Sequence, residues 1–126
     1  MAQNVRPMIH VPDVRAAAEW YARIGFTVIG TYDDGGDDLI FAVLSFGGSE
    51  VMFDCGGQGS TQSRREVDLY LDVDNVDELY ERLKGGVEEV EGLHDTFYGM
   101  REFIIRDLNG FWITFGQRPP VAVPHQ

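Results

Sequence analysis

Side chains that could do chemistry recur at every second residue in four short segments of this 126-residue chain. The first two segments carry Arg6, Met8 and His10, then Glu50, Met52 and Asp54. The other two carry Asp68, Tyr70 and Asp72, then Trp112, Thr114 and Gly116. Carboxylates can ligate a metal ion or attract a cation, and aromatic rings can stack on a planar ligand. Since period-two spacing in β-strands puts these residues on one side of a sheet, we expect one surface, called the open face below.

The intervening residues of these segments are mostly apolar, which predicts a face packed on helices. They are Ile9, Val11, Val51, Phe53, Cys55, Val67, Leu69, Leu71, Val73, Phe111, Ile113 and Phe115. We expect Cys55 to be a small buried hydrophobe there. A polar sheet face can simply be solvated. The large side chains of Met8, Met52, Tyr70 and Trp112 instead favour a partly closed cavity or an interface on the open face.

Two stretches read as copies of one another, residues 5–26 and residues 67–87. Each has a strand, an Asp or Asn cap and an amphipathic helix that ends at glycine. The predicted strands are 5–11, 26–32, 39–46 and 50–55, then 67–73, 87–90, 101–106 and 111–116. The predicted inner helix faces are Val14, Ala17, Ala18, Tyr21 and Ile24, then Val76, Leu79, Tyr80 and Leu83. The pattern predicts an α+β fold of two similar halves that complete each other or a second subunit.

Domain organisation follows from the repeat. We expect one domain over residues 1–126, made of repeat 4–56 and repeat 66–117. The polar, Gly-rich residues 56–66 are interpreted as the link, because a phosphate loop would need a following Lys-Ser or Lys-Thr and a helix. The Pro-rich tail, residues 118–126, cannot extend a central strand and is either disordered or an arm on a neighbour.

Charge and cysteine content exclude several classes. With 21 acidic and 10 basic residues the net charge is −11, which opposes nucleic acid and anionic membranes. The charge either draws cationic ligands or only keeps the surface solvated. Neither a membrane span nor a signal peptide is indicated, so a cytoplasmic location is predicted. Nucleophilic catalysis lacks support because Cys55, Ser45, Ser49 and Ser60 have no adjacent base or elbow context.

Three sequence stretches carry a resemblance to a known family: VPDVRAAAEWYARIGF, EVMFDCG and YGMREFIIRDLNGFWITFG. They resemble the vicinal oxygen chelate superfamily of glyoxalase I, bleomycin resistance proteins, extradiol dioxygenases, fosfomycin resistance proteins and methylmalonyl-CoA epimerases. The resemblance implies paired βαβββ modules that form a curved mixed sheet with helices on the outer face, the glyoxalase/bleomycin resistance fold.

The family's metal ligands fall, by this resemblance, on Arg6, Glu50, Asp68 and Thr114. Arginine cannot coordinate a cation and threonine is a poor neutral ligand, so we predict no metal and no cofactor. Arg6 would replace the metal as a fixed positive charge paired with Glu50 and Asp68, unless it bends out to solvent. The open alternative is that His10 substitutes as a ligand.

The resemblance is strongest in character to the metal-free bleomycin resistance proteins, which are dimers that bind a cationic antibiotic between subunits. We therefore predict a homodimer that binds or sequesters a small aromatic molecule, leaving open whether it is cationic. The predicted ligand-binding residues are Arg6, Met8, His10, Glu50, Met52, Asp54, Asp68, Tyr70, Asp72, Tyr98, Glu102, Trp112 and Thr114. Two alternatives stay open, a metal-dependent lyase, isomerase or dioxygenase that uses His10, Glu50 and Asp68, and an inert ligand-sensing or interaction domain. No catalytic residue is predicted, and catalysis is the less favoured reading.

Overall fold

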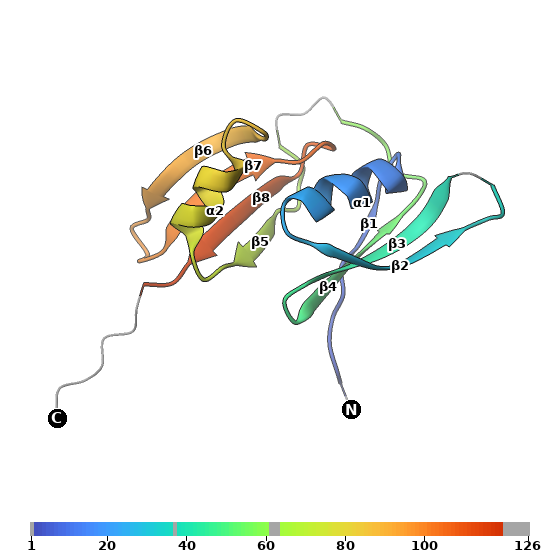
Figure 1. Cartoon of the computed structure of the whole chain (residues 1–126), viewed down its shortest axis with the longest axis horizontal. Helices are drawn as coiled ribbons and strands as arrows, with labels where there is room; N and C mark the ends of the chain where they lie inside the picture. Colours follow the sequence, from blue (N-terminus) through green and yellow to red (C-terminus); the bar gives the residue numbers. More distant parts are fainter. Residues whose placement is uncertain (1, 37, 61–63, 120–126) are drawn as a thin grey trace. The chain divides into compact units, whose positions relative to one another are not determined.

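The computed structural model describes residues 2–36, 38–60 and 64–119. The chain divides into two compact units, Met1–Ser60 and Thr61–Gln126, called unit 1 and unit 2. Unit 1 contains β1 (Met8–His10), α1 (Val14–Arg23), β2 (Thr27–Asp33), β3 (Leu39–Phe46) and β4 (Ser49–Asp54) (Figure 1). Unit 2 contains β5 (Leu69–Asp72), α2 (Val76–Leu83), β6 (Glu88–Asp95), β7 (Arg101–Arg106) and β8 (Trp112–Gln117). Whether the units form one domain stays a prediction.

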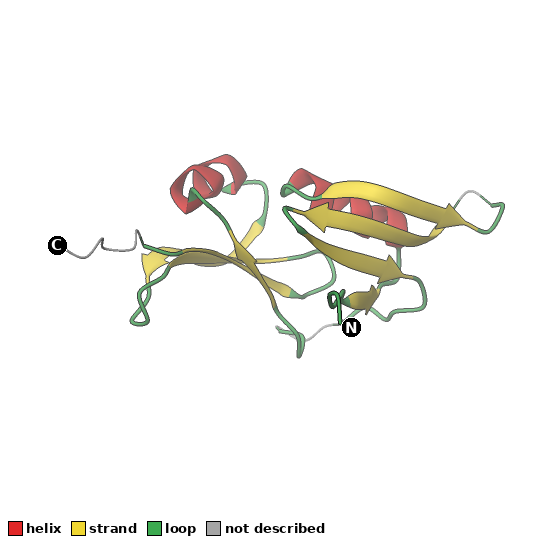
Figure 2. Ribbon diagram, turned by 90° about the horizontal axis from the view of Figure 1, so that it is seen from below, coloured by secondary structure: helices red, strands yellow, loops and turns green. Residues whose placement is uncertain are grey.

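Both units have the same topology. Each has a four-stranded sheet, in the order β1-β4-β3-β2 and β5-β8-β7-β6. The first strand pairs in parallel with the last, and the other neighbours are antiparallel. A helix lies on one face of each sheet (Figure 2). The predicted α+β fold of paired βαβββ modules is therefore confirmed.

Helix α1 begins and ends where the sequence predicts. Asp13 caps it, because its Oδ1 accepts a hydrogen bond of 3.0 Å from the backbone N–H of Ala16. The glycine after the C-cap, Gly25, has a φ of 119°, which L side chains rarely adopt. The predicted inner face is buried as a whole: Val14, Ala17, Ala18, Tyr21 and Ile24.

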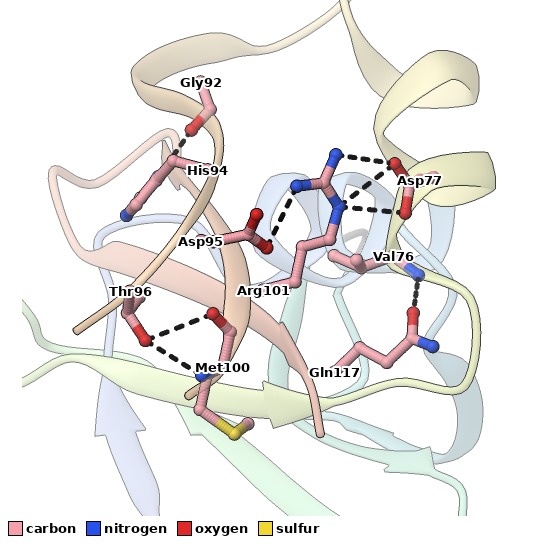
Figure 3. Close-up of polar contacts among 9 residues, drawn as sticks. All are labelled: Val76, Asp77, Gly92, His94, Asp95, Thr96, Met100, Arg101 and Gln117. Carbon is pink, nitrogen blue, oxygen red and sulfur yellow. Dashed lines mark hydrogen bonds and ion pairs between the residues drawn. The ribbon is translucent and has the colours of Figure 1, made fainter. Parts of the chain in front are cut away.

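Helix α2 is shorter and less deeply packed. The predicted cap at Asp74 or Asn75 is Asn75, whose side chain accepts from the backbone N–H of Glu78 at 3.1 Å. Gln117 at the end of β8 also serves this terminus, since its Oε1 accepts from Val76 N at 2.8 Å (Figure 3). Of the predicted inner face, Val76 and Leu83 are buried, while Leu79 and Tyr80 are half-buried.

The face that packs on the helices is largely as predicted. Its buried members are Val11, Val51, Phe53, Leu71, Phe111, Ile113 and Phe115. The prediction was wrong for Cys55, which is exposed because β4 ends at Asp54 and the alternation stops there. It was also wrong for Val67, which is 57% exposed and precedes β5.

Three strands differ in length from the prediction. β1 covers only Met8–His10 because Pro7 has no N–H to give to a ladder, although its carbonyl accepts from Met52 N at 2.9 Å. β5 begins only at Leu69, which pairs with Ile113 near the start of β8. β6 runs on to Asp95 because register shifts in its pairing with β7 break the period-two pattern from which the strand was predicted.

The predictions for the link and the tail are only partly testable. Residues 56–60 and 64–66 contain no helix or strand, while 61–63 lie outside the described residues. The tail prediction also lies outside them from residue 120 onward. Within the described ranges, no helix combines the length and apolar character needed to cross a membrane.

Candidate functional site

The centre of the unit 2 open face is a buried carboxylate held by two phenols. Glu102 on β7 is only 3% exposed. Its Oε2 accepts a hydrogen bond from the Tyr70 hydroxyl at 2.6 Å, and its Oε1 accepts one from the Tyr98 hydroxyl at 2.7 Å. We call these three residues the Glu102 cluster. Removing a carboxylate from water costs several kcal/mol, so both charge-assisted bonds are needed to keep it there.

A missing side chain on β8 lets Tyr70 reach Glu102. The strand order places β8 between β5, which carries Tyr70, and β7, which carries Glu102. A Cβ atom at Gly116 on β8 would lie 2.0 Å from the Tyr70 hydroxyl oxygen. The tyrosine ring therefore lies directly over the Gly116 backbone, and any larger residue would push it away from the carboxylate.

The second phenol comes from the turn between β6 and β7. The Thr96 side chain closes this turn, because its Oγ1 donates to Met100 O at 3.1 Å and accepts from Met100 N at 2.9 Å (Figure 3). Gly99 has a φ of 88°, which supplies the sharp bend. This closed turn positions Tyr98 over Glu102, which is four residues further on.

Both phenols of the cluster are held in the protonated form. The pKa of Tyr70 is raised well above its ordinary range, mainly by burial and then by the hydrogen bond to Glu102. The pKa of Tyr98 is raised mainly by its hydrogen bond to the same carboxylate. Both hydroxyls therefore keep their protons at neutral pH and donate them to Glu102.

Arginine and tryptophan stack at the other end of the unit 2 open face. The Arg64 guanidinium carbon lies 4.1 Å from the centroid of the Trp112 ring. The Nε of Arg64 donates to Asp68 Oδ1 at 3.3 Å, and its second terminal nitrogen contacts the other oxygen of Asp68. This hydrogen bond raises the pKa of Arg64 further above its ordinary value. Sequence analysis missed Arg64, although its spacing of four residues from Asp68 was visible.

A hollow of about 350 Å³ adjoins the Glu102 cluster. Its lining is Asp72, Val73, Asp74, Gly116, Gln117 and Arg118. Two carboxylates and one guanidinium therefore border the strand ends beside Gly116, over which Tyr70 lies. Thr114, the neighbour of Tyr70 in the sheet, is buried at 8% exposure.

Unit 1 has a different open face. The Arg6 guanidinium is 3.2 Å from Glu50 Oε1, so this expected ion pair is present, with both side chains more than a third exposed. The expected second partner, Asp68, pairs with Arg64 inside unit 2. The Nδ1 of His10 lies 3.2 Å from the Cys55 carbonyl oxygen and 3.9 Å from Asp54 Oδ2.

Methionines occupy the middle of the unit 1 open face. Met8 on β1 pairs in register with Met52 on β4, and Val43 on β3 flanks Met52 on the other side. Met8 is 48% exposed.

The predicted site residues are divided between the two units. Unit 1 holds Arg6, Met8, His10, Glu50, Met52 and Asp54. Unit 2 holds Asp68, Tyr70, Asp72, Tyr98, Glu102, Trp112 and Thr114. That the two sets form one binding surface stays a prediction.

The residues at the family's metal positions do not fit a metal. Arg6 carries a positive charge and is paired with Glu50, and Thr114 offers a neutral hydroxyl. Across the described ranges, no three His, Cys, Asp or Glu side chains are grouped so that they could hold a metal ion.

Known structures share this architecture. TioX from Micromonospora sp. ML1 superposes with a TM-score of 0.76 at 25% identity, covering 94% of this chain and 100% of its own. A bleomycin-binding protein solved with bleomycin has a TM-score of 0.70 at 18% identity, over 94% of this chain and 100% of its own. A bleomycin resistance determinant encoded on the transposon Tn5 has a TM-score of 0.67 at 19% identity, over 93% and 98%. Among curated protein sequences, none matches significantly. The sequence profile of the Glyoxalase/Bleomycin resistance protein/Dioxygenase superfamily matches residues 5–115, and the chain therefore belongs to this superfamily.

Proposed function

We propose that the protein binds a small aromatic molecule on the open face of unit 2 without a metal ion, and sequesters it. The observation that carries this proposal is the Glu102 cluster, a carboxylate that is 3% exposed with both oxygens bound by phenols. An apolar residue in the same place would cost nothing in desolvation and would often be equally or more stable. We therefore attribute Glu102 to recognition rather than to packing.

The chemistry of the cluster indicates what it would bind. The side chains of Tyr70 and Tyr98 are about half exposed, so ring surface is available for stacking. Behind the rings lies an anion, and Asp72 and Asp74 border the neighbouring hollow. Aromatic surface backed by carboxylates suits an aromatic ligand that carries hydrogen-bond donors or a positive charge. The net charge of −11 adds a long-range attraction for cations.

Antibiotic binding is the specific form of this proposal. Two similar structures are a bleomycin-binding protein and a bleomycin resistance determinant. Bleomycin is thus the first ligand to test, and resistance by sequestration is the cellular role that we propose. This role needs no catalytic residue.

We further propose a homodimer. Edge strand β2 exposes three large side chains, with Val28 at 39%, Ile29 at 52% and Tyr32 at 63%. An edge strand with exposed apolar side chains can pair with other chains and aggregate. A second copy that covers this strand prevents such aggregation. Light scattering at micromolar concentration should give twice the mass of the chain, whereas a monomer would contradict this part of the proposal.

The test of the binding proposal is a titration of chelator-treated protein. Calorimetry with metal-free bleomycin, and with a neutral aromatic compound as a control, should show binding of bleomycin that divalent metal does not strengthen. Binding that appears only after Zn²⁺ or Mn²⁺ is added would overturn the metal-independent function and favour a metal-dependent enzyme. The absence of heat for every aromatic compound tried, with or without metal, would overturn the proposal as a whole.

A further inference from the structure

Two consecutive arginines straddle the start of β8. Arg64 lies over the Trp112 ring at 4.1 Å, and Arg65 lies over the Phe111 ring at 4.6 Å. Neighbouring residues of a strand point to opposite faces, so Arg64 covers the open face and Arg65 covers the helix-packed face. Arg65 also donates to Asn109 O at 3.1 Å, which ties it to the β7–β8 turn. The pair offers a natural comparison, because only one of the two arginines touches the proposed ligand surface.

The surroundings of the Arg64 guanidinium have the composition of a cation site. The Trp112 ring supplies a π face, and the Asp68 carboxylate supplies the opposite charge. A flat cation held by an aromatic face and a carboxylate is the arrangement by which proteins recognise guanidinium and related ligands. The contact therefore has the geometry of a planar cation stacked on an aromatic face beside a carboxylate.

We infer that Trp112 and Asp68 form a subsite for a planar cation, which Arg64 fills when no ligand is bound. The entering group is an amidinium, a guanidinium or a heteroaromatic cation, and it displaces Arg64 as it stacks on Trp112. This inference rests on the proposed function, since it names the charged part of the ligand for the same open face.

Arg64 is suited to leave the subsite. Its side chain is 53% exposed, so the guanidinium can turn into water without breaking a packed core. The residue precedes β5 and is not part of a strand, so its displacement disturbs no ladder. Since a tethered arginine competes with the ligand, the parent protein must bind a planar cation more weakly than the same subsite would without Arg64.

Exposure of Trp112 tests the occupancy without any ligand. In a Trp20→Phe background Trp112 is the remaining tryptophan, and its quenching by acrylamide reports how far the ring is shielded. Arg64→Ala should increase the quenching constant, while Arg65→Ala should leave it at the parent value. Equal quenching in the parent and Arg64→Ala, with both proteins folded by circular dichroism, would overturn the occupancy.

Benzamidinium, with the neutral benzamide as its control, tests the ligand class. Benzamidinium should restore protection of Trp112 in Arg64→Ala, with an affinity roughly two- to five-fold above that of the parent, as expected for a solvent-exposed cation–π contact. Arg65→Ala should bind like the parent, and benzamide should protect neither protein. Protection by benzamide as strong as by benzamidinium would overturn the cation subsite. Unchanged binding of bleomycin by Trp112→Ala would also overturn the cation subsite, but it would leave the proposed function intact.

Discussion

The two units share one fold but differ in the side chains at the centre of their open faces. In unit 1, the sheet register puts Phe41 beside Asp54, and Met8 beside Met52. In unit 2, the corresponding pairs are Glu102 beside Gly116, and Tyr70 beside Thr114. At these positions the apolar side chains of Met8, Met52 and Phe41 in unit 1 thus correspond to Tyr70, Thr114 and the buried carboxylate of Glu102 in unit 2.

The helix-packed faces differ much less. Tyr21 of unit 1 packs with Phe26 and Phe53, and Phe103 of unit 2 packs with Tyr80 and Phe115. Each unit has to cover its sheet with a helix, so its aromatic core is constrained by stability. The open face has no such requirement, which leaves its residues free to serve binding. Because of this difference, the polar groups of unit 2 are the residues to which we assign the proposed binding.

The largest expected effect on stability comes from Gly116→Ala in unit 2. The added Cβ would lie 2.0 Å from the Tyr70 hydroxyl, so the ring must move and Glu102 loses one donor. A buried acceptor left unpaired costs about 1–3 kcal/mol, which urea denaturation should detect as a lower free energy of unfolding. Gly48→Ala in unit 1 is the matched control, because nothing lies within 4 Å of its added Cβ. Equal stability of the two variants would contradict the positioning role of Gly116.

The second-largest effect on stability is expected for the Glu102 cluster at alkaline pH. The folded pKa values of Tyr70 and Tyr98 lie above their unfolded value of about 10. Their stabilising contribution is therefore complete below about pH 10 and is lost as pH rises through the folded pKa. Tyr70→Phe should make the alkaline fall in the free energy of unfolding less steep. Identical slopes for the parent and Tyr70→Phe would show that the phenol does not titrate differently in the folded protein.

The smallest effect on stability is expected for the ion pairs of Arg101 in unit 2. Arg101 joins α2 to the sheet, donating to Asp77 at 3.0 Å and to Asp95 at 3.1 Å (Figure 3). The hydrogen bond from Arg101 lowers the pKa of Asp77, so its contribution is present above the unfolded pKa of about 4 and is lost as pH falls through the folded pKa. In a plot of melting temperature against pH, Asp77→Asn should make the fall at acidic pH slightly less steep. The effect is small because exposed ion pairs contribute little to stability. A fall as steep as that of the parent would count against this role.

Alternation and capping explain why so much of the fold could be predicted from the sequence. Asp13, Asn75 and the apolar positions of β4 and β8 carry local signals whose meaning does not depend on the rest of the chain. The prediction failed at β6, where bulges shift the register, and at Cys55, which lies just beyond a strand end.

The candidate site was predictable only in part, because its decisive contacts are tertiary. The residues Tyr70, Tyr98 and Glu102 were all predicted, but nothing local indicates that both phenols converge on one carboxylate. Arg64 was not predicted because it lies in the polar link. Its stacking on Trp112 is a tertiary contact between residues far apart in the sequence.

The central claim, that the buried carboxylate of unit 2 serves binding rather than stability, is tested most directly by Glu102→Leu. Both the free energy of unfolding and the affinity for metal-free bleomycin should be measured on this one variant. We expect the stability to be unchanged or raised, since a hydrophobe replaces a buried charge. The affinity should fall about ten-fold, because Tyr70 and Tyr98 lose the charge-assisted hydrogen bonds that hold their rings in place and the ligand loses the carboxylate behind them. A variant that unfolds more easily and still binds bleomycin with the parent affinity would contradict the account.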